Sequence, residues 1–180
     1  ENVINRLPYG KVYILDQTHS ELIDYPCIYQ NFKKDIYEGL QGGLKQIKKY
    51  QKIILLYNEE RQPEGILEGF NLFCAQYGIQ NKIINNLTDR ELLKGELYII
   101  LDDKNLIRII KRIKDEHLTL AKDIGIISYN DTLLKEIVEG GITTISTNFN
   151  LMGERLAEMI LNNEFAQVAN PNRLILRKSL

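Results

Sequence analysis

The sequence predicts an α/β fold built from doubly wound parallel sheets, and two observations predict it. Short runs of β-branched and other apolar residues recur along the 180-residue chain, and stretches with helical periodicity separate them. Runs that are apolar on both faces are typical of parallel strands covered by helices on each side. Regular alternation of strand and helix is typical of βαβ units.

The expected strands and helices follow one another in order. The apolar runs that predict strands are 11–15, 52–57, 82–84, 97–101 and 124–129, of which 82–84 is the weakest. Apolar residues recur at helical spacing in 32–50, 63–77, 103–116 and 151–161. Pro63 suits the first turn of its helix, and Gly78 is placed to end it. Residues 17–26 predict a loop, and a final strand is expected at 174–176 after an Asn-rich segment.

Charge and composition narrow the function. Lys and Arg number 23 against 24 Asp and Glu, so the chain is nearly neutral and lacks the basic footprint of a nucleic-acid-binding surface. Any contact with DNA would belong to an attached domain. No apolar run approaches the roughly 18 residues that span a bilayer. Cys27 and Cys74 have no metal or redox spacing and are expected in the core, which suits a reducing, cytoplasmic setting.

Polar side chains stand where the expected strands end. They are Asp16, Asn58, Asp102, Asp103, Tyr129, Asn130 and Asp131. Ligands of open parallel sheets bind beyond the carboxyl ends of the strands, and sugars need carboxylates, amides and an aromatic face. The competing explanation is that Asp and Asn at these places cap the next helix. We expect Asp103 and Asp131 to be caps, and Asp16, Asp102 and Asn130 to contact a ligand.

The stretch from Asp123 to Leu161 carries a family pattern. A strand ends in Tyr129-Asn130-Asp131, a short helix and the strand 142–145 follow, and then comes a helix that contains Gly153. This order of elements resembles the effector-binding domains of the LacI/GalR repressor family. Weaker matches upstream are Leu15-Asp16, residues 67–70 and residues 101–103, so the resemblance covers nearly the whole chain.

The resemblance implies a fold of the type I periplasmic-binding-protein kind, with two Rossmann-like α/β lobes and a sugar between them. Residues 31–145 would form the C-terminal lobe, and residues 1–30 and 146–180 the remainder of an incomplete N-terminal lobe. The DNA-binding domain would lie outside this chain. Winged-helix regulators of the GntR type carry the same effector domain, so the attached head could be of either kind.

The same resemblance implies which residues contact the ligand. Asp16, Asp102 and Asn130 stand at family contact positions, and Thr147 and Phe149 match polar and aromatic contacts near the hinge, although Phe149 would also suit the core. Tyr57 and Tyr129 are expected to lie half in the core and half in the cleft wall.

Several positions depart from the family. Ile66 stands where the family has an Arg that binds sugar hydroxyls; Arg61 is a possible substitute or a plain surface residue. Asp102 stands where the family usually has Asn, and Asn130 stands where it usually has Asp. An acid and an amide are thus exchanged between the two positions. The helix expected between Leu87 and Gly95 looks shortened, which would open one wall of the cleft.

These features together predict the ligand-sensing domain of a bacterial transcriptional regulator. The expected effector is a monosaccharide or sugar-phosphate, the expected assembly a homodimer, and no catalysis, metal or cofactor is expected. One alternative is a solute-binding protein of a sugar transport system. A third is a flavodoxin-like or receiver-like phosphoacceptor domain, in which Asp16, Asp102, Asp103 and Lys104 would form the site, although the order of these residues fits it poorly.

Overall fold

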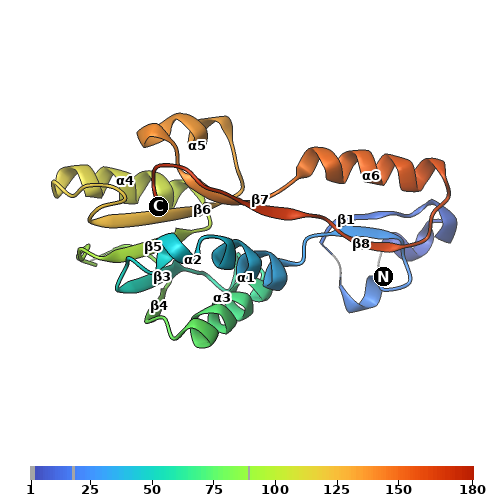
Figure 1. Cartoon of the computed structure of the whole chain (residues 1–180). Coiled ribbons are helices and arrows are strands. Elements are labelled where there is room, and N and C mark those ends of the chain that lie inside the picture. The colour runs from blue at the N-terminus through green and yellow to red at the C-terminus, as the bar shows by residue number, and fades with distance from the viewer. Residues whose placement is uncertain (1–2, 18, 89) are drawn as a thin grey trace. The chain divides into compact units, whose positions relative to one another are not determined.

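The computed structural model describes residues 3–17, 19–88 and 90–180. The chain divides into two compact units, coloured along the chain in Figure 1. Unit 1 comprises the described part of Glu1–Asn31 together with Thr147–Asn172. Unit 2 comprises Phe32–Ser146 and Arg173–Leu180. Because the order of the units in space is not fixed, each unit is described by itself.

Unit 2 is built on a six-stranded sheet in the order β4-β3-β5-β6-β7-β9. The strands are β3 (Lys52–Leu56), β4 (Asn81–Ile84), β5 (Glu96–Ile100), β6 (Ile124–Tyr129), β7 (Thr143–Thr147) and β9 (Asn172–Ile175). The pairs of β3 with β4 and β5, of β5 with β6 and of β6 with β7 are parallel. Their carboxyl ends therefore share one edge of the sheet.

Helices cover both faces of this sheet (Figure 1). They are α1 (Phe32–Gly42), α2 (Leu44–Ile47), α3 (Glu64–Tyr77), α4 (Asp103–Asp115) and α5 (Leu133–Ile137), with the 3₁₀ turn η4 (Val138–Gly140) after α5. Successive strand residues point to opposite faces, so Ile53 and Leu55 pack with α1 and α3 whereas Ile54 and Leu56 pack on the α4 side. Burial on both faces explains why the runs are continuously apolar.

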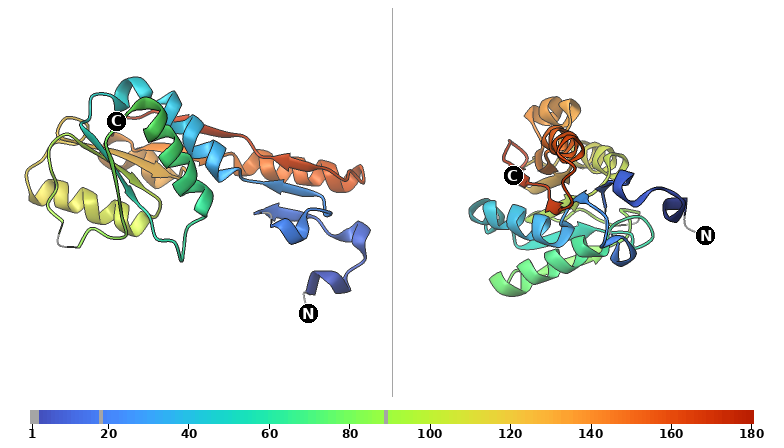
Figure 2. Two further views of the ribbon diagram at one scale, coloured as in Figure 1. Left: turned by 90° about the horizontal axis from the view of Figure 1, so that it is seen from below. Right: turned by 90° about the vertical axis from the view of Figure 1, so that its right-hand side faces the viewer.

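The helices α1 and α3 lie side by side over one face, as the blue and green ribbons of Figure 2 show. Their approach requires a glycine: a Cβ on Gly69 would lie 2.2 Å from the Lys33 carbonyl oxygen. Gly39 has a similar role against the sheet, since its Cβ would meet the Ile145 side chain at 2.8 Å. The absence of a side chain at Gly39 therefore lets α1 approach strand β7 closely.

Unit 1 contains a three-stranded parallel sheet in the order β1-β2-β8. Its strands are β1 (Ile14–Asp16), β2 (Cys27–Tyr29) and β8 (Gln167–Ala169), and its helix is α6 (Phe149–Leu161). The helix packs on β2 through Met152, Met159 and Ile28. The remaining described turns of this unit are 3₁₀ segments: η1 (Val3–Arg6), η2 (Tyr9–Lys11) and η3 (Ser20–Leu22).

The α/β class with doubly wound parallel sheets is confirmed, and the differences are local. The expected helix 32–50 breaks at Gly43, which separates α1 from α2. Helix α6 begins two residues earlier than expected because Asn148 caps it, its Oδ1 accepting from Leu151 N at 3.0 Å. Strands β2 and β8 were not predicted; each has three residues and pairs only within a small sheet. The expected loop 17–26 contains η3, with residue 18 outside the described part.

The division at the C-terminal end differs from the expected lobes. All of 146–180 was expected in the N-terminal lobe, but residues 173–180 belong to unit 2. Strand β9 joins the six-stranded sheet. Beyond it, Ser179 Oγ accepts from Thr143 N and donates to Ile126 O, both at 2.7 Å. These bonds anchor the last residues against β6 and β7.

Candidate ligand-binding site

A cavity of about 470 Å³ lies at the carboxyl ends of β3 and β5 in unit 2. Asn58 and Arg61, from the turn after β3, line one part of it. Asp102 and the first turn of α4 line another, with Lys104, Asn105 and Arg108. Three of the sequence-predicted residues, Asn58, Arg61 and Asp102, are thus brought together.

The turn after β3 is held by its own polar side chains. Asn58 donates its N–H to Gln62 Oε1, and its Oδ1 accepts from Glu60 N at 3.0 Å. Arg61 N donates to Asn58 O at 3.0 Å, which closes the turn. Arg61 is exposed, as a surface residue would be, and its side chain lines the cavity. Ile66 is buried and packs in the core rather than facing a ligand.

Asp102 caps helix α4 and also lines the cavity. Its Oδ1 accepts from Asn105 N at 2.9 Å, and its Oδ2 accepts from Asn105 Nδ2 at 2.8 Å. Each carboxylate oxygen has two lone pairs, so each keeps the capacity to accept another hydrogen bond. Capping and ligand contact are therefore compatible at this position.

Tyr129 and Asn130 end strand β6 with polar atoms that lack partners among the described residues. The Tyr129 hydroxyl and the Asn130 Oδ1 are both buried in this state. Burial, and secondly the negative charge of Asp35, raise the pKa of Tyr129 above its usual value. Asn130 adopts a left-handed conformation with φ 59°. Unsatisfied buried polar groups are costly, and a bound ligand is one way to satisfy them.

The expectation that Asp103 and Asp131 are helix caps is wrong. Asp103 lies inside α4 and pairs with Lys135, Oδ1 to Nζ at 2.9 Å. The cap of α5 is Thr132, whose Oγ1 accepts from Lys135 N. Asp131 instead forms a bidentate ion pair with Arg177, whose Nη1 donates to Oδ1 at 2.5 Å and whose Nη2 donates to Oδ2 at 2.8 Å. The Arg177 guanidinium lowers the pKa of Asp131.

In unit 1, Gln30 joins two of the predicted residues. Its Nε2 donates to Asp16 Oδ1 at 2.5 Å, and its Oε1 accepts from Thr147 Oγ1 at 2.7 Å. Asp16 has a positive φ of 80° at the end of β1. Phe149 is the first residue of α6 and is 48% exposed, so it is not a core residue.

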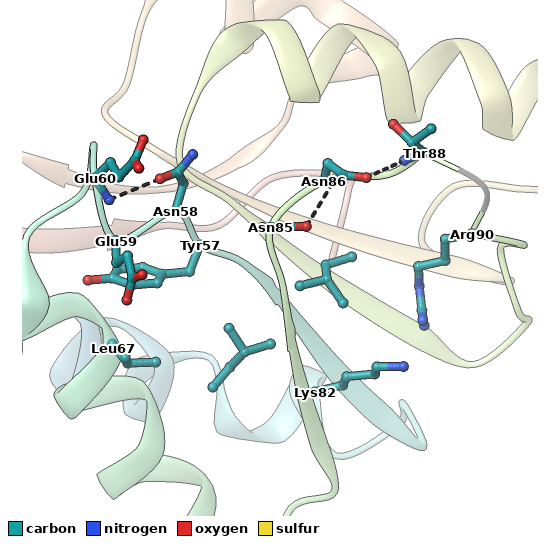
Figure 3. A pocket seen from close by; sticks show the side chains of 12 residues that line it. Tyr57, Asn58, Glu59, Glu60, Leu67, Lys82, Asn85, Asn86, Thr88 and Arg90 are labelled. Carbon is teal, nitrogen blue, oxygen red and sulfur yellow. Dashed lines mark hydrogen bonds between the residues drawn. The ribbon is translucent and has the colours of Figure 1, made fainter.

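The segment between β4 and β5 forms no helix in its described residues, whereas a shortened helix was expected there. Beside it lies an open depression of about 870 Å³ (Figure 3). It shares Tyr57, Asn58, Asn85 and Asn86 with the smaller cavity. Residue 89 lies outside the described residues.

Sequence reasoning missed Gln30 and Lys135. Lys135 is 3% exposed, although the sequence presents it as an ordinary lysine in the short helix Leu133–Ile137. Gln30 follows an apolar strand end directly, which is the same signal that marked Asp16 and Asn58. The strand before Gln30, β2, was not predicted, so that signal did not reach Gln30, and nothing local marks Lys135.

Solved structures of sugar-operon and related repressors share this fold. The Escherichia coli transcriptional repressor AscG superposes with a TM-score of 0.77 at 16% identity, covering 98% of this chain and 72% of that one. A dimeric lac repressor gives 0.73 at 17% identity, covering 93% and 68%. A protein described as the probable maltose operon repressor of a Staphylococcus gives 0.75 at 19%, covering 92% and 66%.

The chain therefore has the type I periplasmic-binding-protein-like fold of LacI-family effector domains, as the sequence predicted. By its match over residues 47–180, it belongs to the periplasmic binding protein-like domain family.

A curated protein also matches part of this chain. The phosphoenolpyruvate-protein phosphotransferase of Buchnera aphidicola subsp. Schizaphis graminum is 22% identical over 142 residues. The match covers 78% of this chain but only 25% of that protein.

Proposed function

We propose that this chain is the effector-sensing domain of a transcriptional regulator and that its ligand is a sugar-phosphate or a monosaccharide. The observation that carries the proposal is the row of polar side chains along one sheet edge, with Asn58 after β3, Asp102 after β5 and Asn130 after β6. Ligand binding there would change how an attached head presents itself to operator DNA. The three repressor structures support the proposal through their fold.

The charges around the smaller cavity favour a phosphorylated sugar. Three cationic side chains line it, Arg61, Lys104 and Arg108, against one acidic side chain, Asp102. A concave surface with an excess of positive charge attracts anions. Arg also matches phosphate geometry with paired N–H donors. The Asp102 carboxylate would accept hydrogen bonds from sugar hydroxyls.

The test is thermal unfolding of the full-length protein against pentoses, hexoses, deoxyhexoses and their phosphates. A ligand at about 100 times its Kd stabilises the native state by ~2.7 kcal/mol, which raises Tm by several degrees. We expect the largest shift with a sugar-phosphate. The variant Asp102→Ser should abolish the shift while retaining the cap of α4, since Ser is a good N-cap residue. Asp115→Ser, at the exposed far end of α4, is the matched control.

Absence of a shift across the whole panel, at millimolar concentrations, would contradict a sugar effector. Binding that leaves the affinity of the full-length protein for DNA unchanged would favour a solute-binding protein. We also propose that the domain binds its ligand without catalysis. The compound that raises Tm should therefore be recovered chemically unchanged after prolonged incubation with the protein. Appearance of a product would contradict this part of the proposal.

We further propose that the protein works as a homodimer in the cytoplasm, where operator DNA is found. Two observations support this. One structural neighbour is described as a dimeric lac repressor. In this chain, α5 exposes Leu133 and Ile137, and the neighbouring α4 exposes Ile107. No helix in the described part of the chain is long and apolar enough to cross a membrane.

A further inference from the structure

Helix α5 exposes its apolar side chains and buries a lysine, the opposite of what a surface helix normally does. Its apolar side chains point outward, with Leu133 84% and Ile137 74% exposed. Its one buried residue is Lys135, which is 3% exposed. A short surface helix normally buries its apolar stripe and leaves its lysines in water. The attachment of α5 to unit 2 therefore depends on the ammonium group of Lys135.

The Lys135 ammonium has three oxygen partners in the described part of the chain. Its Nζ donates to the carbonyl oxygens of Tyr129 at 2.7 Å and Asn130 at 2.8 Å. It also pairs with Asp103 Oδ1 at 2.9 Å. An ammonium has three donors, so this set uses all of them. Burying a charge is costly unless it is paired and hydrogen-bonded, and this arrangement meets both conditions.

These partners lie where the chain presents the candidate ligand residues, at the start of α4 after β5 and at the end of β6. Asp103 follows Asp102 directly, after β5. The carbonyl of Asn130 belongs to a residue held at φ 59°, a region that side chains other than glycine rarely adopt. Backbone contacts hold the same loop from the other side, because Asn130 N donates to Ile145 O at 2.8 Å. One side chain thus connects the loop after β5 with the loop after β6.

We propose that Lys135 is a positioning residue that fixes Asp102 and Asn130 relative to one another. It does not touch the ligand; it holds the backbone from which the two polar side chains extend. The consequence for binding rests on the proposed function, whereas the link between the loops does not. Lys135→Met keeps the length and removes the donors, and it leaves two carbonyl oxygens without their partner.

The first experiment measures hydrogen–deuterium exchange of the full-length protein without ligand. In Lys135→Met we expect exchange to accelerate by about tenfold or more in residues 101–106 and 129–133, with β3 unchanged, because only the local opening free energy falls. Lys111→Met, at an exposed lysine of α4, is the control and should match the wild type. Unchanged exchange in both loops would overturn the proposal.

If Lys135→Met accelerates exchange everywhere, Asp103→Asn decides the question. It removes the charged partner of Lys135 and retains the cap at Asp102. We expect faster exchange confined to residues 101–106 and 129–133. The absence of any change there would show that the pair does not hold the loops and would equally overturn the proposal.

The second experiment is a double-mutant cycle of Lys135→Met with Asn130→Gly, in which glycine removes the side chain without straining the positive φ. The cycle is measured as the Kd of the compound that shifts the wild-type Tm. If Lys135 acts through Asn130, the double variant should bind less than tenfold more weakly than Asn130→Gly alone, even when Lys135→Met alone loses about tenfold or more. Independent, multiplying effects would overturn the role in binding. Failure of the wild type to bind any compound would contradict the proposed function. The hydrogen–deuterium exchange experiment would still test whether Lys135 holds the two loops together.

Discussion

The ion pair between Asp131 and Arg177 is expected to contribute to the free energy of unfolding in a pH-dependent way. Asp131 and Arg177 form two hydrogen bonds and are 24% and 15% exposed, so solvent screens the pair only in part. Asp131 belongs to the loop after β6 and Arg177 to the C-terminal residues, so the pair connects these two segments. Arg177 Nη1 also donates to Ile142 O at 3.0 Å. The C-terminal segment therefore contributes to holding the site-bearing edge of the sheet.

We predict that Arg177→Met lowers the free energy of unfolding by about 2 kcal/mol at pH 7, a typical value for a charge-assisted pair. Arg177 lowers the pKa of Asp131 in the folded state, so the stabilisation is present above the unfolded pKa of about 4 and is lost as the pH falls through the lower folded pKa. Urea unfolding at pH 7 and pH 3 measures it. The neighbouring exposed Lys178→Met is the control, and an equal loss at both pH values would contradict the prediction.

The sequence indicated the strand-end residues Asn58, Asp102 and Asn130, because the end of an apolar run is visible in the letters themselves. It did not indicate Lys135 or Gln30. Their importance arises from partners that only folding brings near: the carbonyls of β6 for Lys135, and Thr147, distant in sequence, for Gln30. The assignments of Asp103 and Asp131 failed for the same reason, since their partners lie 32 and 46 residues away.

The pairing of α1 with α3 shows how one glycine sets the distance between two helices. The sequence predicted both helices, but it could not reveal that Gly69 meets the Lys33 carbonyl, because the crossing of two helices depends on side chains from both. The break at Gly43 and the short strands β2 and β8 were equally hidden, since each depends on neighbours in space. Long, strongly periodic elements were predicted, whereas the three-residue strands β2 and β8 were not.

We predict that Gly69→Ala lowers the free energy of unfolding by roughly 1–3 kcal/mol or more, because a Cβ there overlaps backbone that must move. Gly153→Ala is the matched control: that glycine lies within α6 with no atom near its added Cβ, and alanine there should raise stability by about 0.5–1 kcal/mol. Chemical unfolding of both variants measures the difference. A neutral Gly69→Ala would show that α1 and α3 can separate freely.

At the scale of the whole chain, the proposed homodimer would link fold to regulation through the surface that a second copy covers. Exposed apolar side chains on monomeric proteins are normal when single, but neighbouring ones mark interaction surfaces. The α4–α5 surface has Ile107, Leu133 and Ile137, and an ion pair at 2.5 Å joins Lys114 of α4 to Glu139 of η4, the turn directly after α5. Helix α6 of unit 1 also exposes apolar residues, among them Leu161 at 80%.

We predict that Leu133→Glu with Ile137→Glu prevents formation of the proposed homodimer by the full-length protein, because association would bury two carboxylates without partners. Both side chains are already exposed, so the folded monomer should lose little stability, and its unfolding curve provides the check. Leu161→Glu, on α6, is the comparison and should leave the dimer intact. Sedimentation velocity at micromolar concentration distinguishes the species. Dissociation by Leu161→Glu alone would contradict the prediction and place the interface on α6 instead.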